Sequence, residues 1–255
     1  MTEEFYDSAY LQKTGLLAQS MKEASYESFK CLRDSTIVDL GCGSGEDVYR
    51  LSKLLDSSNS IIGADHNAIL LNEAKSKNNA RSNCQFIQTE AHQLPFANNS
   101  VNALRTERMF QHLKAPYKTM MEINRVLCDR GEICILESDW KGLSFYHENS
   151  EVEEKICLYL TQKKVNNGYA SRTLIQTLID CHFKIEKTQI FTTSFHSLEE
   201  ANEALQINTI LKECYDNGFF SSKEYLDCLY SFSELNAKNA FVCSINSVLI
   251  NATKQ

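Results

Sequence analysis

The sequence predicts an α/β protein with a mostly parallel sheet and helices on both of its faces. Three observations predict this class. Short apolar and β-branched segments alternate with longer helical ones along most of the chain, which is typical of βαβ units. A cluster of glycines follows the first strand, and acidic residues follow the next two. The chain has 255 residues, which is enough for one large domain, 1–255.

The first half of the chain carries the clearest alternation. Residues 1–34 are predicted as an N-terminal helical segment. β-Branched and apolar runs favour strands, which we expect at 36–40, 61–65, 84–89, 101–106 and 131–138. Amphipathic helices are expected at 46–55, 68–80 and 117–127.

The alternation breaks after Trp140 and then resumes. A helix over 171–181 and a strand over 183–193 come next, and the apolar segment 241–252 predicts an antiparallel edge strand. Residues 141–170 and 197–237 are additional, mostly helical material. We expect both to form a helical lid that covers a substrate.

Charge and cysteine usage exclude several classes of protein. The net charge is −7, from 26 Lys+Arg and 33 Asp+Glu, which disfavours a dedicated nucleic-acid binder because phosphate neutralisation needs a basic face. None of the ten cysteines stands in a CxxC pair, so we expect reduced thiols and no metal site. The acidic start does not resemble a signal peptide, and no segment reaches the ~20 apolar residues of a membrane span. The expected location is cytoplasmic.

The glycine cluster lies where an open α/β sheet binds its ligand, beyond the carboxyl end of a strand. Gly41, Gly43 and Gly45 let the backbone turn sharply and let a ligand approach closely. A dinucleotide-binding fingerprint would place its third glycine at position 46, which is Glu46. An acid at a helix N-terminus would repel a pyrophosphate, so the pattern disfavours NAD or FAD.

Two acids follow the next strands. Asp65 ends the second strand, where a carboxylate accepts hydrogen bonds from both ribose hydroxyls of a nucleoside. The alternative is an N-cap for the helix over 68–80, a role that Asn67 would fill equally well. Glu90 follows the third strand and would accept from an adenine amino group, or else is an exposed loop acid.

Together these motifs resemble the class I S-adenosylmethionine-dependent methyltransferases, and among them the ubiquinone- and menaquinone-biosynthesis-like methyltransferase 11 family. The resemblance covers about residues 36–140 and rests on VDLGCGSG, GADHN, TEAHQLPF and RTERMFQHLKAPYKTMMEINRVLCDRGEICILESDW. It implies a Rossmann-like sheet of order 3-2-1-4-5-7-6 with strand 7 antiparallel. It also implies S-adenosyl-L-methionine as cofactor and S-adenosyl-L-homocysteine as product.

The resemblance further implies which residues hold this cofactor. They are Asp39, Gly41, Cys42, Gly43 and Gly45 around its methionine and ribose end, Asp65 at the ribose, His66 and Asn67 beside the adenosine, Glu90 and the Ala91 N–H at the adenine, and Arg105 and Thr106 at the methionine end.

Three residues near the ends of the fourth and fifth strands are predicted as possible bases: Glu107, His112 and Asp139. His112 has the most suitable pKa, because an unperturbed imidazole titrates near neutral pH. The alternative for His112 is a buried structural histidine in its turn.

Four further residues are predicted at the acceptor. Arg108 would anchor an acidic substrate, or would instead pair with Glu107. Trp140 would form a wall of the acceptor pocket, and Tyr6 and Tyr10 would close over it. Core packing is the alternative for all three aromatic residues.

The expected function is methyl transfer from S-adenosylmethionine to a small-molecule acceptor, by in-line displacement onto an O, N or C atom. Such a displacement depends on aligning the nucleophile with the methyl carbon and needs no metal. The first alternative is an RNA or protein methyltransferase, which a basic strip beside the pocket would favour. The second is a non-catalytic S-adenosylmethionine-binding protein, whose pocket would have no room for an acceptor.

Overall fold

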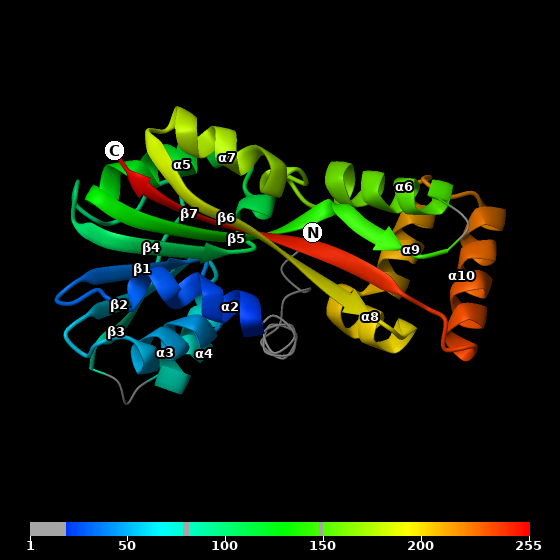
Figure 1. Cartoon of the computed structure of the whole chain (residues 1–255), viewed down its shortest axis with the longest axis horizontal. Coiled ribbons are helices and arrows are strands. Elements are labelled where there is room, and N and C mark those ends of the chain that lie inside the picture. The colour runs from blue at the N-terminus through cyan, green and yellow to red at the C-terminus, as the bar shows by residue number, and fades with distance from the viewer. Residues whose placement is uncertain (1–18, 79–81, 148–149) are drawn as a thin grey trace.

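The computed structural model describes residues 19–78, 82–147 and 150–255. Seven strands form one sheet of order β3-β2-β1-β4-β5-β7-β6, with β7 antiparallel to both of its neighbours (Figure 1). This confirms the predicted fold class and strand order. The expectation that segment 241–252 forms an edge strand was wrong, because β7 pairs with β5 on one side and with β6 on the other, which leaves β6 at the edge. The strands are β1 (Thr36–Leu40), β2 (Ser60–Asp65), β3 (Cys84–Gln88), β4 (Val101–Glu107), β5 (Leu127–Phe145), β6 (Phe183–Phe195) and β7 (Cys243–Lys254).

Helices cover both faces of this sheet (Figure 1). One face packs on α2 (Gln19–Tyr26), α3 (Glu46–Leu54) and α4 (Ala68–Asn78), and the other on α5 (Pro116–Val126) and α7 (Ala170–Asp180). Each helix buries an apolar stripe at helical spacing, as Met120 and Ile123 of α5 show. Burial of these stripes fixes the helices on the sheet and leaves the carboxyl ends of β1, β2 and β4 together at one edge.

Three strands run well beyond the central sheet and carry a second hydrophobic core. The ends of β5, β6 and β7 pack with α6 (Ser150–Tyr159), α8 (Leu198–Leu205), α9 (Ile207–Asp216) and α10 (Ser222–Ala237). Phe232 of α10 stacks on Phe145 of β5 at 4.9 Å and meets the edge of Phe241 at 5.4 Å. We call this second core, with its helices, the helical lobe (Figure 1).

The prediction of helical structure for residues 141–145 was wrong. These residues continue β5, because β7 supplies pairing partners such as Ser244 for Ser144 and Cys243 for Phe145. The polar residues Lys141 and Gly142 hide this strand in the sequence. The helical material that follows is α6 and a short π-helix over Leu160–Lys164.

An irregularity in the ladder interrupts β5 between Asp139 and Ser144, where its register with β7 shifts. Bulges of this kind bend a strand and redirect its side chains. Trp140 lies in the irregular stretch, and its indole N–H donates to Gln111 in the loop after β4. The bulge therefore lies where β5 leaves the central sheet for the helical lobe, beside that loop.

Candidate functional site

The turn after β1 has a left-handed backbone at all three of its glycines. The φ angles are 78° at Gly41, 51° at Gly43 and 77° at Gly45, a region that residues with a Cβ rarely adopt. The N–H of Gly41 donates to the carbonyl of Ala64 at 2.7 Å, which ties the turn to the end of β2. A Cβ on Gly45 would lie 2.8 Å from that of Ala74, so glycine also permits α3 to pack on α4.

Asp65 links this turn to the end of β2. One carboxylate oxygen accepts from the N–H of Gly43 at 2.8 Å, and the other from the N–H of Asn67 at 2.9 Å and lies 3.2 Å from Nδ1 of His66. Burial opposes ionisation, but the hydrogen bonds from His66, Asn67 and Gly43 outweigh it and lower the pKa of Asp65. The structure therefore holds a charged carboxylate against the glycine turn.

The capping of α4 falls to Asn67 and not to Asp65. The side-chain oxygen of Asn67 accepts from the N–H groups of Ile69 at 2.9 Å and Leu70 at 3.2 Å. These are the N2 and N3 donors that an N-cap satisfies. Asp65 is thus left to accept from the glycine turn.

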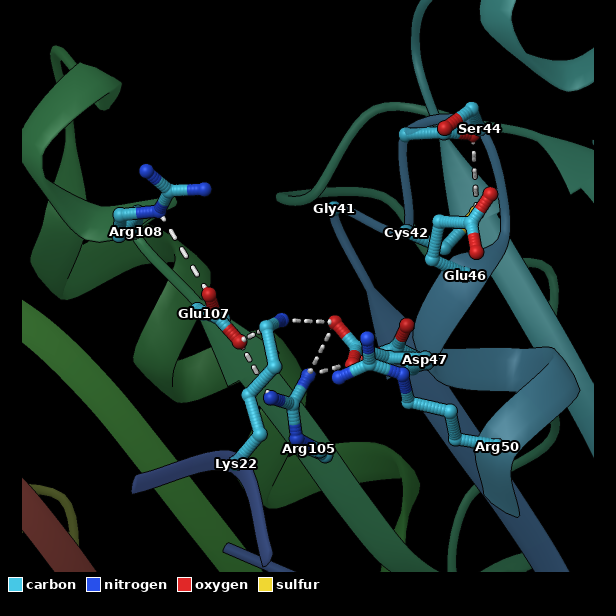
Figure 2. Close-up of a pocket in the computed structure, with 12 residues that line it drawn as sticks. Lys22, Gly41, Cys42, Ser44, Glu46, Asp47, Arg50, Arg105, Glu107 and Arg108 are labelled. Carbon is cyan, nitrogen blue, oxygen red and sulfur yellow. Dashed lines mark hydrogen bonds and ion pairs between the residues drawn. The ribbon is translucent and has the colours of Figure 1, made fainter. Parts of the chain in front are cut away.

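A pocket opens beside the glycine turn, between β1, β4, α2 and α3 (Figure 2). It brings together seven residues that the sequence predicted for the site: Asp39, Gly41, Cys42, Gly43, Arg105, Glu107 and Arg108. Five further lining residues were not predicted: Lys22, Ser44, Glu46, Asp47 and Arg50. Asp65, His66, Asn67, Glu90 and Ala91 lie outside this pocket, at the ends of β2 and β3.

Charged side chains at the base of this pocket form a group that we call the ion-pair cluster: Lys22, Asp39, Asp47, Arg105 and Glu107. Nζ of Lys22 lies 2.6 Å from a carboxylate oxygen of Asp47 and 2.6 Å from one of Glu107 (Figure 2). Because Lys22 is on α2, Asp47 on α3 and Glu107 on β4, a single ammonium joins three elements.

Arg105 is the centre of the ion-pair cluster. Its guanidinium lies 3.1 Å from Asp39 and 3.4 Å from Asp47, bonds to Glu107, and donates through Nε to Ser25 at 2.9 Å. Only 1% of the Arg105 surface is exposed. A guanidinium this deeply buried requires carboxylates around it, since an unpaired buried charge is very costly.

The ion-pair cluster also determines the protonation of its carboxyl groups. Burial raises the pKa of Asp39, although the charge of Arg105 opposes the shift. For Asp47 burial is outweighed by Arg105 and Lys22, and for Glu107 by Lys22 and Arg105, so the pKa of each is lowered. Glu107 therefore neutralises the charges of Lys22 and Arg105, and its lowered pKa makes it a poor proton acceptor for the predicted role of a base.

Two buried hydroxyls at this edge of the sheet lack a hydrogen-bond partner within the described part of the chain, Ser44 Oγ and Thr106 Oγ1. Ser44 lies in the glycine turn, and Thr106 pairs in register with Leu40 at the end of β1. Buried hydroxyls in proteins are nearly always bonded. Ser44 lines the pocket, whereas Thr106 alternates along β4 with the pocket residues Arg105 and Glu107 and so faces the other side of the sheet.

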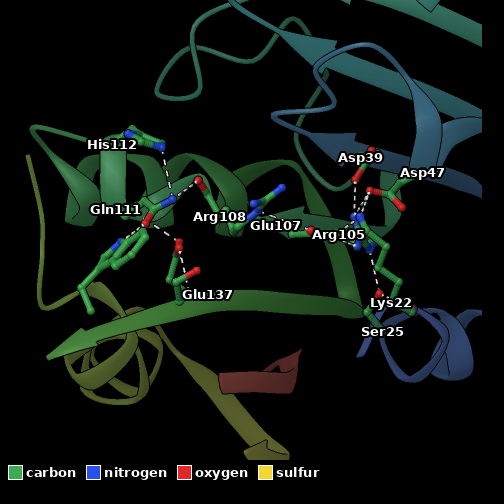
Figure 3. Close-up of polar contacts among 12 residues, drawn as sticks. Lys22, Ser25, Asp39, Asp47, Arg105, Glu107, Arg108, Gln111, His112 and Glu137 are labelled. Carbon is green, nitrogen blue, oxygen red and sulfur yellow. Dashed lines mark hydrogen bonds and ion pairs between the residues drawn. The ribbon is translucent and has the colours of Figure 1, made fainter. Parts of the chain in front are cut away.

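The loop after β4 contains a short 3-10 turn, Phe110–His112, which is fixed from several sides. The backbone N–H of Gln111 donates to Glu137 at 3.2 Å, and its side chain bonds to Trp140, to the carbonyl of Arg108 at 3.0 Å and to His112 (Figure 3). Burial raises the pKa of Glu137 to about 8. Glu137 was not singled out from the sequence, because nothing in the strand distinguishes an acid that faces the turn from its other acids.

The same turn is held from the other side by the segment that precedes α7. The backbone N–H of Asn167 donates to the carbonyl of Gln111 at 2.9 Å, and the side chain of Asn166 donates to the carbonyl of His112 at 2.8 Å. The 3-10 turn is therefore braced between β5 and the chain that leaves the π-helix.

His112 is exposed at the end of this turn. Nε2 of its ring lies 3.2 Å from the amide nitrogen of Gln111. Desolvation of the ring, together with the positive charges of Arg108 and His66, lowers the pKa of His112 to about 4. The imidazole is thus neutral at physiological pH, and its ring is shielded from solvent although the residue as a whole is exposed.

Arg108 begins this loop in a left-handed conformation, with φ of 50°. Its Nε lies 3.6 Å from a carboxylate oxygen of Glu107. Arg108 therefore makes the ion pair with Glu107 that was given as the alternative to substrate binding. A non-glycine residue in this region stores strain, which is common at functional sites. Arg108 also lines the pocket and is partly exposed there.

The remaining predicted residues have other surroundings. Asp139 accepts two hydrogen bonds from Arg172, each of 2.9 Å, which gives it a structural ion pair in place of the predicted base role. Glu90 is exposed after β3. Tyr6 and Tyr10 lie outside the described residues.

Among the lining residues that were not predicted, the sequence gives a signal for Asp47 and Arg50 but none for Lys22. Asp47 and Arg50 lie one and four residues into the helix that follows the glycine turn, where side chains on one face point toward the turn. Lys22 lies in a polar helix far from any motif, and only packing of α2 against β4 brings it to the pocket.

The described residues contain no cluster of three or more His, Cys, Asp or Glu side chains that would hold a metal ion. All ten cysteines are free thiols. Within the described ranges, no helix has the length and apolar character needed to cross a membrane.

The methyltransferase domain family matches residues 32–197. Over 83% of this chain, an "uncharacterized 37.1 kDa protein in transposon TN4556" of Streptomyces fradiae is 26% identical, and the match covers 62% of that protein. A demethylmenaquinone methyltransferase of Lactococcus lactis is 29% identical over 46% of this chain and 47% of its own length. This chain therefore spans about half to three-fifths of the length of these curated relatives.

The fold resembles that of a solved structure from Bacillus halodurans, described as a putative methyltransferase. The TM-score is 0.64 at 15% identity, and the likeness covers 91% of this chain and 97% of the other.

Proposed function

Since this chain belongs to the methyltransferase domain family, which matches residues 32–197, we propose that it transfers the methyl group of S-adenosyl-L-methionine to a small-molecule acceptor. One observation carries the proposal: the charged Asp65 and the three left-handed glycines meet at the ends of two neighbouring parallel strands. A bidentate carboxylate beside a backbone without Cβ atoms is the arrangement that grips a nucleoside at this edge of an α/β sheet.

The surrounding residues fit this cofactor. A Cβ on Gly41 would lie 3.1 Å from the Met109 side chain, so glycine permits Met109 to pack closely on the turn. Ser44 offers a buried hydroxyl without a partner among the described residues, and Asp65 offers lone pairs to ribose hydroxyls. We assign the ribose to Asp65 and the adenosine to His66, Asn67, Glu90 and Ala91, all at the ends of β2 and β3.

The pocket proposed for the methionine end is lined by charged side chains of both signs. An α-ammonium and an α-carboxylate need an acid and a base, and the pocket offers Asp39 and Arg105 beside the glycine turn, with Arg50 on α3. When bound, the cofactor supplies an electrophilic methyl group on a sulfonium. The contribution of this chain is to bind, orient and keep water from the reacting atoms, and orientation alone can supply about 7–11 kcal/mol of the barrier.

A small molecule is the proposed acceptor class for two reasons. Acidic and basic side chains are mixed around the pocket and equal in number, four of each, so its lining offers no basic strip for a nucleic acid. One of the relatives reported above is a demethylmenaquinone methyltransferase. We assign the acceptor pocket to the side of Arg108, His112 and Trp140, with the helical lobe as its cover.

Calorimetric titration with S-adenosylmethionine and S-adenosylhomocysteine tests the proposal. The wild-type protein is expected to bind both, and Asp65→Ala should weaken both about 10- to 100-fold, because each charged hydrogen bond contributes about 1.5–3 kcal/mol. Asp180→Ala, an exposed acid on α7, is the matched control and should bind as the wild type does. Failure of the folded wild-type protein to bind either compound would remove the proposed function.

A further inference from the structure

We propose that Gln111, oriented by Trp140, is a positioning residue that fixes His112 as the neutral tautomer with its proton on Nδ1. His112 is then not a general base, because Gln111 occupies the lone pair on Nε2. The inference deepens the proposed function and rests on it, since it concerns the acceptor side of the same site.

The orientation of the Gln111 amide follows from its two partners. The indole nitrogen of Trp140 only donates, so the atom of Gln111 that it contacts must be the carbonyl oxygen. The other end of the amide lies 3.0 Å from the carbonyl oxygen of Arg108, which only accepts, so that end must be the NH₂ group. Both contacts demand the same orientation, and burial of Gln111 at 2% exposure keeps water from replacing either.

The orientation of the amide determines the proton on His112. The NH₂ group of Gln111 lies 3.2 Å from Nε2 of the ring (Figure 3). A donor at this distance requires a lone pair on Nε2, and a neutral imidazole with a lone pair on Nε2 carries its proton on Nδ1. The lone pair that would take up a proton from an acceptor is therefore the one that Gln111 occupies.

Trp140 reaches Gln111 because of the irregular stretch of β5, and Gln111 is held because Glu137 accepts its backbone N–H. Both contacts come from the same strand. The strand that carries the helical lobe thus also sets the tautomer at the site.

The test is a long-range ¹H–¹⁵N correlation spectrum of the histidine rings, which distinguishes the two neutral tautomers and the cation. The full chain is labelled with ¹⁵N and measured at pH 7 with S-adenosylhomocysteine, and the signals of His112 are identified by their loss in His112→Gln. The wild type is expected to show a proton on Nδ1 of His112 and none on Nε2.

Two variants test the positioning role. In Gln111→Glu a carboxylate replaces the donor, so the proton of His112 should move to Nε2. In Trp140→Phe the amide loses the contact that orients it, so the second tautomer should become populated. Gln176→Glu, an exposed change of the same kind on α7, should leave the His112 signals unchanged.

A wild-type spectrum with the proton on Nε2, or on both nitrogens, would overturn the inference. An unchanged tautomer in folded Gln111→Glu would also overturn it, and an unchanged one in Trp140→Phe would remove the role of Trp140. If Gln111→Glu fails to fold, the wild-type and Trp140→Phe spectra still decide. Calorimetry with S-adenosylhomocysteine on the same samples keeps the two proposals apart, because loss of binding counts against the cofactor site alone.

Discussion

At the scale of single residues, the ion-pair cluster concentrates more charge than any other buried part of the described chain. Lys22 and Arg105 are buried, and each depends on carboxylates from different elements. The electrostatic gain of such a cluster over an apolar replacement is small, because every ion must be desolvated. Removing one member, however, leaves its partners buried and uncompensated.

We therefore expect Lys22→Met to lower the free energy of unfolding by about 3 kcal/mol, since Asp47 and Glu107 both lose the ammonium between them. Chemical denaturation measures the change. Lys30→Met is the matched control, because Lys30 pairs with Glu27 in solvent and should contribute less than about 0.5 kcal/mol. Equal effects of the two substitutions would contradict the buried pairing.

Glu137 gives a prediction in pH. Burial raises the pKa of Glu137 from 4.5 to about 8 in the folded protein, so the folded state holds a proton that the unfolded state releases. Stability from this group is complete below its unfolded value of 4.5 and is lost as the pH rises through about 8. Glu137→Gln stays neutral at every pH and should remove this loss.

Denaturation of both proteins across this pH range is the measurement, and the wild type should lose stability relative to Glu137→Gln as the pH rises. Glu186→Gln is the control, because Glu186 is exposed on β6 and its pKa is lowered. If the free energy of unfolding changes with pH in the same way for the wild type and for Glu137→Gln, Glu137 is not held neutral in the folded protein.

At the scale of elements, most strands and helices of the central sheet could be predicted from the sequence. β1 begins and ends where its β-branched run does, and α3 starts directly after the glycine turn. Residues close in sequence determine where these elements begin and end, because a glycine or an N-cap residue such as Asn67 lies at the boundary. The length of β5 is not local, since its second half is a strand only because β7 pairs with it.

The π-helix gives a prediction at this scale. A Cβ on Gly168 would lie 2.3 Å from the Cα and from the carbonyl oxygen of Thr161, and the backbone there has no room to move. Gly168→Ala should therefore lower the free energy of unfolding by about 2 kcal/mol or more, as overpacking does. Thermal melting measures it.

Gly218→Ala separates this clash from simple backbone strain. Gly218 has φ of 76° and no atom within 4 Å of an added Cβ, so only the strain term applies, about 1 kcal/mol. If Gly168→Ala is no worse than Gly218→Ala, the close contact with the π-helix does not exist in solution.

At the scale of the whole molecule, the second hydrophobic core is the feature that sequence reasoning missed. The residues proposed to hold the cofactor could be singled out because they follow strands in short motifs, such as Gly41 to Gly45. The pocket itself could not, because Lys22 reaches it only through the packing of α2. Likewise, only three-dimensional packing shows that 197–237 joins the ends of three strands in one core.

The continuous strands predict that both cores unfold together. Phe232→Ala removes a side chain that packs between Phe145 and Phe241 and should cost about 3–5 kcal/mol. Because β5, β6 and β7 enter both cores, calorimetric melting should show one transition, shifted to lower temperature. Two separate transitions would mean that the helical lobe is an independent unit.

Tyr230→Ala, on the same helix but 67% exposed, is the control and should change stability by less than about 0.5 kcal/mol.

The passage of β5 through both cores also limits how this protein can change over evolutionary time. Side chains alternate along a strand, so the loss or gain of one residue would turn every later side chain, Leu143 and Phe145 among them, to the opposite face. The irregular stretch before Ser144 is the one place along the pairing with β7 where the ladder already absorbs such a change. Insertions and deletions in this strand are therefore expected to be tolerated only at the irregular stretch, whereas a single-codon deletion before Trp140 would turn the side chains that pack in the lobe outward and separate Trp140 from Gln111.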